Sequence, residues 1–181
     1  MPNISQVEVN GTTYDICDAA ARDDITTARN DIDARGHIAV IGGTSASTNF
    51  TGTATNLKVP FADFYQTPGS ESIFSENNSG IHISTAGWFL ASASIQLGAS
   101  FNDQDIIHLH IKRTQGDDVG YTQLRCAAAA CWSTLSVPPV LFYSESADWN
   151  IWAEAQNQTA ARGYIGQYNS ARNYLMIMKV K

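Results

Sequence analysis

The sequence predicts a mostly β protein, in which a sandwich or barrel of antiparallel strands follows a short β-hairpin and a short coiled-coil helix. One observation is a series of short strand-like segments, separated by turn signals, from Leu57 to Lys181. A second is the helical spacing of apolar residues between Asp18 and Arg35. A third is a segment ahead of that helix in which apolar and polar residues alternate on both sides of a tight-turn sequence. Together they predict a small β-domain, here called the knob, carried on a short stalk.

The composition excludes some classes of function. The chain has 181 residues, of which only 15% are charged, and its formal net charge is −6. A nucleic-acid partner requires a clustered face of Lys and Arg, which the sequence does not offer. A surface with few charges and much Ser, Thr, Asn and Gln suits contacts with proteins or glycans instead.

The first residues indicate where the protein is made. Residues 1–6 have no basic start, and no apolar run of signal-peptide length follows them. No segment approaches the roughly 20 apolar residues that a membrane span needs. We therefore expect synthesis and folding in a cytoplasm, without membrane insertion.

Residues 4–16 are the first expected element, a β-hairpin. Apolar and polar residues alternate there, and Asn10-Gly11 is a strong signal for a two-residue hairpin turn. Residues 1–17 have too few apolar side chains for a core of their own, so they need a foreign surface to bury against. The sequence therefore predicts a particle anchor with contacts from Val7, Val9, Tyr14 and Ile16.

Residues 18–36 are the second element, a helical stem that Gly36 ends as a C-cap. A helix of this length is marginal in water, so its apolar seam needs a partner helix in a trimeric coiled coil. The alternative is a helix that lies on its own domain. Residues 37–56, rich in Gly, Ser and Thr, are expected to be a linker or an extended wrap. The seam residues are Ala21, Ile25, Ala28 and Ile32.

The knob, residues 57–181, is predicted from period-two alternation. In residues 88–97 every second side chain is apolar. In residues 105–113 the alternation puts three aliphatic side chains inside and His108 and His110 outside. The other expected strands cover residues 57–65, 81–84, 121–132, 140–145, 149–156 and 174–181.

Enzyme chemistry is a weaker interpretation. His108 and His110 place two imidazoles on one strand face, as metal-binding cupins do. A cupin also needs a carboxylate about four residues further on, where this chain has Thr114 and Gln115, and a later third histidine, whereas His110 is the last. No Gly-x-Ser-x-Gly elbow or Gly-rich phosphate loop is present. We expect no catalytic residue, no cofactor and no bound metal, and the acidic turn ending at Asp105 is expected to be a solvated hairpin tip.

Candidate external binding residues lie in the last third of the chain. Trp152 shares a strand face with polar Asn150 and Glu154, where an aromatic ring suits either a sugar ring or a subunit contact. The segment 159–173 lacks strand periodicity, and Tyr and Arg in such long loops are favoured recognition residues. The alternative is a loop that merely crosses the top of the knob. The candidates from this segment are Arg162, Tyr164, Tyr168 and Arg172.

One motif and the order of the strands carry a family resemblance. The run from Ile81 to Phe89 has apolar, polar and apolar residues followed, after a short gap, by Ala-Gly and two aromatics. With its neighbours this run resembles the jelly-roll head shared by the complement and tumour-necrosis-factor superfamily, over about two thirds of the chain. Members of that superfamily usually have Gly-Asp before the penultimate strand, whereas this chain has Ala147-Asp148 at that position. The matching segments are residues 59–61, 78–93, 147–155 and 173–180.

The start of the chain carries a second resemblance. Residues 9–25 are similar to the anchor-plus-stem start of many tailed-phage fibre and head-fibre proteins. Together the two resemblances imply a homotrimeric bacteriophage virion protein with a jelly-roll knob, either a fibre or a capsid-decorating protein of head or tail. Its N-terminus would bind a capsid or tail protein, and its knob a host-surface glycan or protein. The alternatives are a soluble trimeric lectin-like module and, behind it, a cupin-type metalloenzyme.

The seam of the stem can be tested by substitution. Replacing Ile25 and Ile32 by Asp should loosen the stem, because carboxylates would then occupy its apolar seam. The knob should stay trimeric, which light scattering at micromolar concentration measures, while the helical circular dichroism should fall. A monomeric protein would contradict the predicted assembly.

Overall fold

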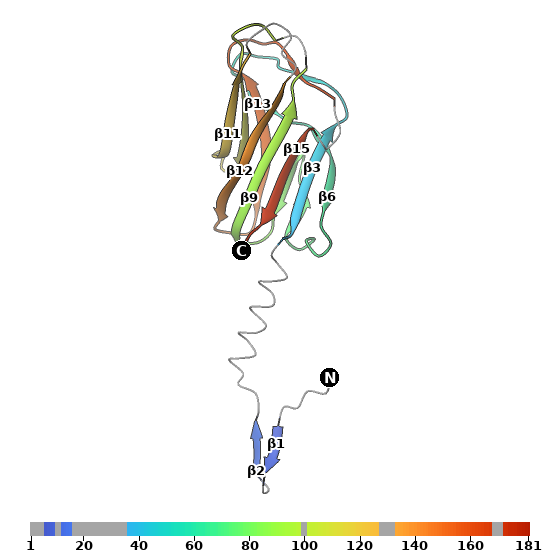
Figure 1. The fold of residues 1–181 in the computed structure, drawn as a ribbon, viewed down its shortest axis with the longest axis vertical. Coiled ribbons are helices and arrows are strands. Elements are labelled where there is room, and N and C mark those ends of the chain that lie inside the picture. Colours follow the sequence, from blue (N-terminus) through green and yellow to red (C-terminus); the bar gives the residue numbers. More distant parts are fainter. Residues whose placement is uncertain (1–5, 10–11, 16–35, 99–100, 127–132, 168–171) are drawn as a thin grey trace. The chain divides into compact units, whose positions relative to one another are not determined.

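The computed structural model describes residues 6–9, 12–15, 36–98, 101–126, 133–167 and 172–181. The chain divides into two compact units, Met1–Arg35 and Gly36–Lys181 (Figure 1). All regular elements among the described residues are β-strands. Nor does this part of the chain contain a helix that is long and apolar enough to cross a membrane.

The N-terminal unit contains the predicted β-hairpin. Strands β1 (Gln6–Val9) and β2 (Thr12–Asp15) pair antiparallel, with two residues between them. Residues 16–35 lie outside the described residues, so the helical stem stays a prediction. The same holds for the seam of Ala21, Ile25, Ala28 and Ile32, and for an anchoring role of Val7, Val9, Tyr14 and Ile16.

The knob is an antiparallel sandwich of two sheets, which confirms the predicted fold class. One sheet has five strands in the order β12, β9, β15, β3 and β6. The other has the order β11, β10, β13, β8 and β7, and the short β5 also pairs with β13. Successive strands pass from one sheet to the other at almost every connection, which gives the jelly-roll arrangement (Figure 1).

The strand bounds are as follows. The five-stranded sheet consists of β3 (Ile38–Thr44), β6 (Phe61–Gln66), β9 (Gly87–Gln96), β12 (Thr134–Ser144) and β15 (Tyr174–Lys179). The six-stranded sheet consists of β5 (Leu57–Lys58), β7 (Phe74–Glu76), β8 (Gly80–Ile83), β10 (Ile106–Arg113), β11 (Asp118–Arg125) and β13 (Trp149–Asn157). A small pair at one end of the sandwich is formed by β4 (Thr48–Asn49) and β14 (Tyr164–Ile165).

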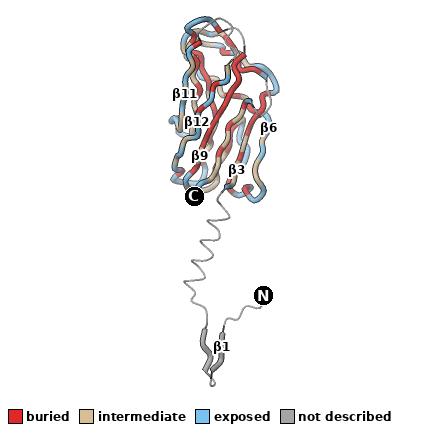
Figure 2. Tube along the Cα trace, viewed as in Figure 1, coloured by how far each residue is buried: buried red, intermediate tan, exposed pale blue. Residues whose placement is uncertain are grey.

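The core fills the space between the sheets with the side chains that the period-two pattern predicts. Phe89 on β9, Leu109 on β10 and Ile151 on β13 are fully buried. Aromatic rings join the two layers, since Phe142 stacks on Phe89 at 5.7 Å between centroids and on Trp149 at 6.4 Å. Figure 2 shows buried residues along β9 and β3, while exposed residues lie in the connections and along the edge strands β11, β12 and β6.

The segment 37–56 corrects the predicted domain boundary. We expected a linker there, but β3 lies in the five-stranded sheet between β15 and β6. Ala39 and Ile41 on β3 are fully buried, so the sheet would lose a central strand without this segment. The rest of the tract is held to the knob, because Phe50 donates its backbone N–H to Gly163 and packs its ring against Phe101. The knob therefore begins at Gly36 rather than at Leu57.

Strand β12 corrects a second boundary. The expected strand over residues 140–145 is too short, because β12 begins at Thr134 and continues through Pro138 and Pro139. The pairing with β9 shifts between Val137 and Val140, so the prolines sit in a bulge. Because β12 is an edge strand, a residue without an N–H is tolerated there. The expected strand 121–132 begins earlier than predicted, since β11 covers Asp118–Arg125, and residues 127–132 lie outside the described residues.

The hallmark glycine of the run Ile81–Phe89 has a steric reason. Gly87 has a φ of 146°, and a Cβ on it would lie 2.3 Å from the backbone oxygen of Lys181. That oxygen accepts the N–H of Trp88 at 2.7 Å, and Trp88 in turn accepts the N–H of Val180 at 2.8 Å. Close contact between β9 and the C-terminal residues therefore requires a glycine at this position.

Replacing Gly87 by Ala should destabilise the knob by about 1–3 kcal/mol, because a side chain is strained at this φ and displaces Lys181. Urea unfolding measured by tryptophan fluorescence gives the difference in unfolding free energy. Gly116→Ala is the matched control, since Gly116 also has a positive φ of 82° but nothing lies within 4 Å of its added Cβ. Equal losses in the two variants would show that backbone strain alone, without the contact to Lys181, accounts for the effect.

Candidate binding surfaces

The outer face of the five-stranded sheet contains a contiguous group of apolar side chains, which we call the apolar outer face; polar residues such as Ser94, Gln96 and Ser136 lie beside it at one end of the sheet. Its side chains form rows across the strands, since Val40 on β3 pairs with Met176 on β15 and with Tyr65 on β6. A neighbouring row places Leu141 opposite Leu90, and Leu90 opposite Met178. The apolar side chains on this face are Ile38, Val40, Tyr65, Trp88, Leu90, Leu141, Tyr143, Met176 and Met178.

Several of these side chains are well exposed in the single chain. Tyr65 is 59% exposed and Leu141 54%, so the ring of one and the aliphatic side chain of the other are open to solvent. Tyr65 also lines a shallow groove of about 350 Å³ with Ile38, Val40 and Pro68. An extended apolar face of this kind on a folded domain marks a protein contact.

The outer face of the six-stranded sheet is polar, with a cluster of aromatic rings on β10 and β11. His108 and His110 point outward as predicted, and His110 stacks on Tyr121 with 5.5 Å between ring centroids. His110 contacts Asp118 through Nδ1 at 3.1 Å and Gln156 through Nε2 at 3.3 Å. Burial and the charge of His110 lower the pKa of His108.

The histidine pair is not part of a metal-binding group in the described part of the chain. Among the described residues no group of three or more His, Cys, Asp and Glu side chains is close enough to hold a metal ion. Both ring nitrogens of His110 already face protein groups, Asp118 on one side and Gln156 on the other. This arrangement gives the pair a packing role on the sheet surface.

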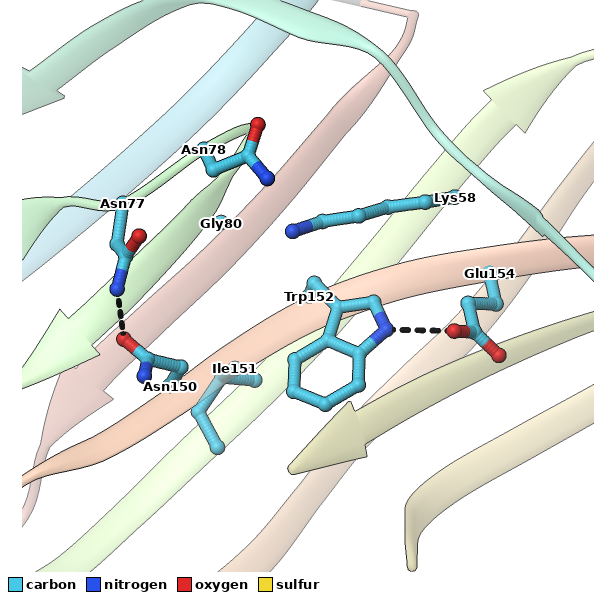
Figure 3. A pocket seen from close by; sticks show the side chains of 8 residues that line it. All are labelled: Lys58, Asn77, Asn78, Gly80, Asn150, Ile151, Trp152 and Glu154. Carbon is cyan, nitrogen blue, oxygen red and sulfur yellow. Dashed lines mark hydrogen bonds between the residues drawn. The ribbon is translucent and has the colours of Figure 1, made fainter. Parts of the chain in front are cut away.

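A pocket on the same outer face surrounds Trp152, and we call it the Trp152 pocket (Figure 3). It is open to solvent and has a volume of about 320 Å³. The indole Nε1 donates a hydrogen bond to Glu154 Oε1 at 2.8 Å, and Lys58 Nζ lies 5.5 Å from the ring centroid. Burial lowers the pKa of Lys58, with Glu154 acting in the opposite direction. The lining residues are Lys58, Asn77, Asn78, Gly80, Asn150, Ile151, Trp152 and Glu154.

The pocket exists because a side chain is missing beside Trp152. The residue opposite Trp152 on β8 is Gly80, which leaves open the space that a larger residue would fill. A Cβ on Gly80 would lie 2.6 Å from the backbone oxygen of Ile151 and 3.2 Å from the Cβ of Trp152. The sequence pattern placed Trp152 on the polar face correctly, but it gave no sign that Gly80 lies opposite, since register is not visible in one strand.

The turn between β7 and β8 forms the rim of the pocket. Asn77 and Gly80 exchange both backbone hydrogen bonds at 2.9 Å, and Asn78 and Ser79 have φ values of 44° and 60°. Two positive φ values between such a pair define a type I′ hairpin turn, which favours asparagine. Ser79 Oγ donates to the backbone oxygen of Phe61 at 3.0 Å and so fixes the turn to the knob.

The four candidate binding residues of segment 159–173 differ in how far they are exposed and in what they contact. Arg162 donates two hydrogen bonds of 2.8 Å to the fully buried Asp105, so its guanidinium has a structural partner. Tyr164 is half-buried and its ring covers Gly98, where a Cβ would lie 1.9 Å from the ring. Arg172 is exposed, whereas Tyr168 lies outside the described residues. An external binding role of these four residues stays a prediction.

Asp105 corrects the expectation of a solvated hairpin tip. Its carboxylate is fully buried and also accepts the backbone N–H of Asn102 at 2.8 Å. Hydrogen bonds from Arg162 lower the pKa of Asp105, against the effect of its burial. The ion pair therefore ties the loop of Arg162 to the start of β10.

Comparisons with known proteins agree with this fold. No family model matches the sequence, and neither does any curated protein. Among solved structures, Eiger TNF from S. frugiperda is 14% identical, with a TM-score of 0.53, over 81% of this chain and 94% of that one. Murine APRIL at pH 5.0 is 11% identical, with a TM-score of 0.56, over 80% and 99% of the two chains. Identities this low define the fold alone, so the knob has a tumour-necrosis-factor-like jelly roll.

Substituting Asp105 by Asn should lower the unfolding free energy at neutral pH, because the Arg162 guanidinium then lacks its carboxylate. The pKa of Asp105 is lowered in the folded chain, so its stabilising effect is complete above the ordinary carboxyl pKa of about 4 and is lost as the pH falls through the folded value. Urea unfolding should therefore separate the two proteins most at neutral pH and progressively less under acid conditions.

Asp117→Asn is the control for this pH series. Asp117 forms an exposed ion pair with Arg113 at 2.8 Å, and such surface pairs contribute little to stability. Its substitution should change the unfolding free energy only slightly at any pH. A difference between wild type and Asp105→Asn that does not shrink in acid would contradict the role given to the ion pair.

Proposed function

We propose that this chain is a homotrimeric structural protein of a bacteriophage virion, a fibre or capsid-decorating protein of head or tail. Its C-terminal knob adheres to a host-surface protein or glycan, and its N-terminal unit binds a capsid or tail protein. The protein is made in the host cytoplasm and is located in the virion. The observation that carries the proposal is the apolar outer face of the five-stranded sheet.

A second copy of the chain is the occupant that suits the apolar outer face best. The sandwich already buries the inner faces of both sheets, so among the described residues of the knob no further element covers the side chains around Met176. In a dimer with a twofold axis, the same patch of both copies meets itself. In a trimer with a threefold axis, the apolar outer face of each copy contacts a different surface of the next copy, and the three contacts close a ring. The jelly-roll fold and the expected coiled-coil stem are both compatible with a threefold axis. Charge also permits it, because the row of Met176 and the row of Met178 contain no charged residue; Asp63 lies in the next row, at the edge strand β6.

The division of the chain into two compact units supports the virion location. The unit Met1–Arg35 contains a hairpin of only two short strands, and a single hairpin is marginally stable without a partner. Residues 9–25 resemble the N-terminal segments of phage fibre proteins, and this resemblance implies that the partner is a capsid or tail protein. A soluble trimeric lectin-like module is the alternative, and it would leave the hairpin without a binding surface. A cupin-type enzyme is disfavoured by the contacts of His110 with Asp118 and Gln156.

Replacing Met176 by Glu should disrupt the trimer, because a carboxylate would be buried without a partner in the centre of the apolar outer face. We expect assembly to weaken by roughly a hundredfold or more, measured by light scattering over a dilution series. The matched control is Gln123→Glu, which adds the same charge to an exposed residue of β11 on the opposite sheet. A wild-type protein that stays monomeric, or two variants that assemble equally well, would contradict the proposed interface.

Deleting residues 1–17 should leave a folded, trimeric knob that no longer joins its particle, because the anchor is lost and the sandwich is not. Incorporation can be measured by complementing a phage that lacks the gene and quantifying the protein in purified particles. Trp152→Ala serves as the control, since it changes only the outward surface and should be incorporated normally. Normal incorporation of the truncated chain would reverse the proposed polarity.

A further inference from the structure

We propose that the Trp152 pocket is a binding site for a neutral saccharide. This inference rests on the proposed function, since it names the ligand class of the outward-facing knob and the place where that ligand binds. The pocket combines an indole ring with three amide side chains, one ammonium group and one carboxylate (Figure 3). The chemistry, the rigidity, the charge and the position of these groups each support a sugar.

The side chains match the two surfaces of a sugar ring. An indole offers an apolar face to the C–H groups of a pyranose, which neutral hydroxyl-rich ligands need for affinity in water. Asn77, Asn78 and Asn150 each provide a donor and an acceptor, so they can pair with neighbouring hydroxyl groups. The volume of about 320 Å³ lies at the small end of the range for ligand sites and suits one or two sugar units.

The indole of Trp152 and the asparagine-containing rim are held in place before a ligand arrives, whereas Lys58 can move. Trp152 comes from β13, which has hydrogen-bonded strands on both sides, and its indole N–H is fixed by Glu154 at 2.8 Å. Asn77 Nδ2 donates to Asn150 Oδ1, which joins the rim of the pocket to the strand beneath it. The type I′ turn at Asn78 is fixed to Phe61 by Ser79. Because the groups are already ordered, a ligand loses little affinity to ordering them.

The charges of the pocket favour a neutral sugar over an acidic one. Lys58 and Glu154 lie opposite each other on β5 and β13, so the site has one positive and one negative group. An acidic sugar would gain from Lys58 but would be repelled by the Glu154 carboxylate beside the indole. Lys58 covers the ring only by a weak cation–π contact, so its flexible side chain can move aside and donate to a sugar hydroxyl.

The position of the pocket keeps it accessible in the proposed assembly. Trp152 and Lys58 lie on the outer face of the six-stranded sheet, whereas the proposed subunit contacts use the outer face of the other sheet. The two outer faces point in opposite directions across the sandwich. A ring of subunits that covers the apolar outer face therefore leaves the Trp152 pocket facing outward.

Titration of the full-length, isotope-labelled chain with a panel of sugars tests the proposal. The panel contains the methyl glycosides of glucose, galactose, mannose and N-acetylglucosamine, with N-acetylneuraminic acid as the acidic arm. We expect at least one neutral glycoside to shift the nuclear magnetic resonance signals of the Trp152 indole N–H and the neighbouring Asn amides at millimolar concentration. Trp152→Ala should weaken that binding about tenfold or more.

Two further variants make the result specific. Asn78→Asp keeps a residue that tolerates the left-handed turn but removes the amide donors, so it should weaken binding several-fold. Tyr121→Ala removes an exposed aromatic ring from the same sheet outside the pocket and should bind sugar as wild type does. Light scattering of each sample reports assembly separately, so loss of the trimer and loss of sugar binding are distinct results.

The proposal is overturned if no neutral glycoside shifts the Trp152 signal, or if the Trp152→Ala variant binds with unchanged affinity. Binding of N-acetylneuraminic acid alone would also overturn it, because the argument from Glu154 excludes an acidic ligand. A protein that binds a neutral glycoside but is monomeric would support the pocket and contradict the assembly.

Discussion

The apolar outer face of the five-stranded sheet is the constraint on which the rest of the account depends. A two-sheet sandwich buries one face of each sheet against the other and leaves two outer faces in contact with water. In this knob one outer face is polar, while the other has rows of aliphatic and aromatic side chains such as Val40, Met176 and Tyr65. Under the proposed assembly another copy covers that face, so that the polar outer face remains outside.

In the proposed assembly the six-stranded sheet is the surface that meets the environment. Its central strand β13 alternates between buried residues such as Ile151 and outward residues such as Trp152. The groups around Trp152 are available for binding because Gly80 leaves space beside the indole. Further along the sheet, His110 and Tyr121 use each other as packing partners. One strand thus supplies the core of the sandwich and the floor of its proposed binding site.

Local patterns predicted much of this fold but not its long-range contacts. Alternation alone gave the inward and outward faces of β9, β10 and β13, because side-chain direction follows from the strand backbone. It did not reveal β3, whose short run from Ile38 to Thr44 merges into a glycine-rich tract. The partnership of Asp105 with Arg162 joins residues 57 positions apart, and nothing near Asp105 in the sequence indicates it. The Trp152 pocket was missed for the same reason, since it depends on the register between β8 and β13.

Oxidation of the methionines by hydrogen peroxide tests most directly whether the apolar outer face is covered in solution. Met176 and Met178 both lie on that face and are half-buried in the single chain, and peptide mass spectrometry can follow their conversion to sulfoxides. If copies of the chain cover the face, both residues should oxidise far more slowly in the native protein than in urea, and Met176→Glu should expose Met178. Native rates close to those of the unfolded chain would contradict the account, because the face would then be open to water.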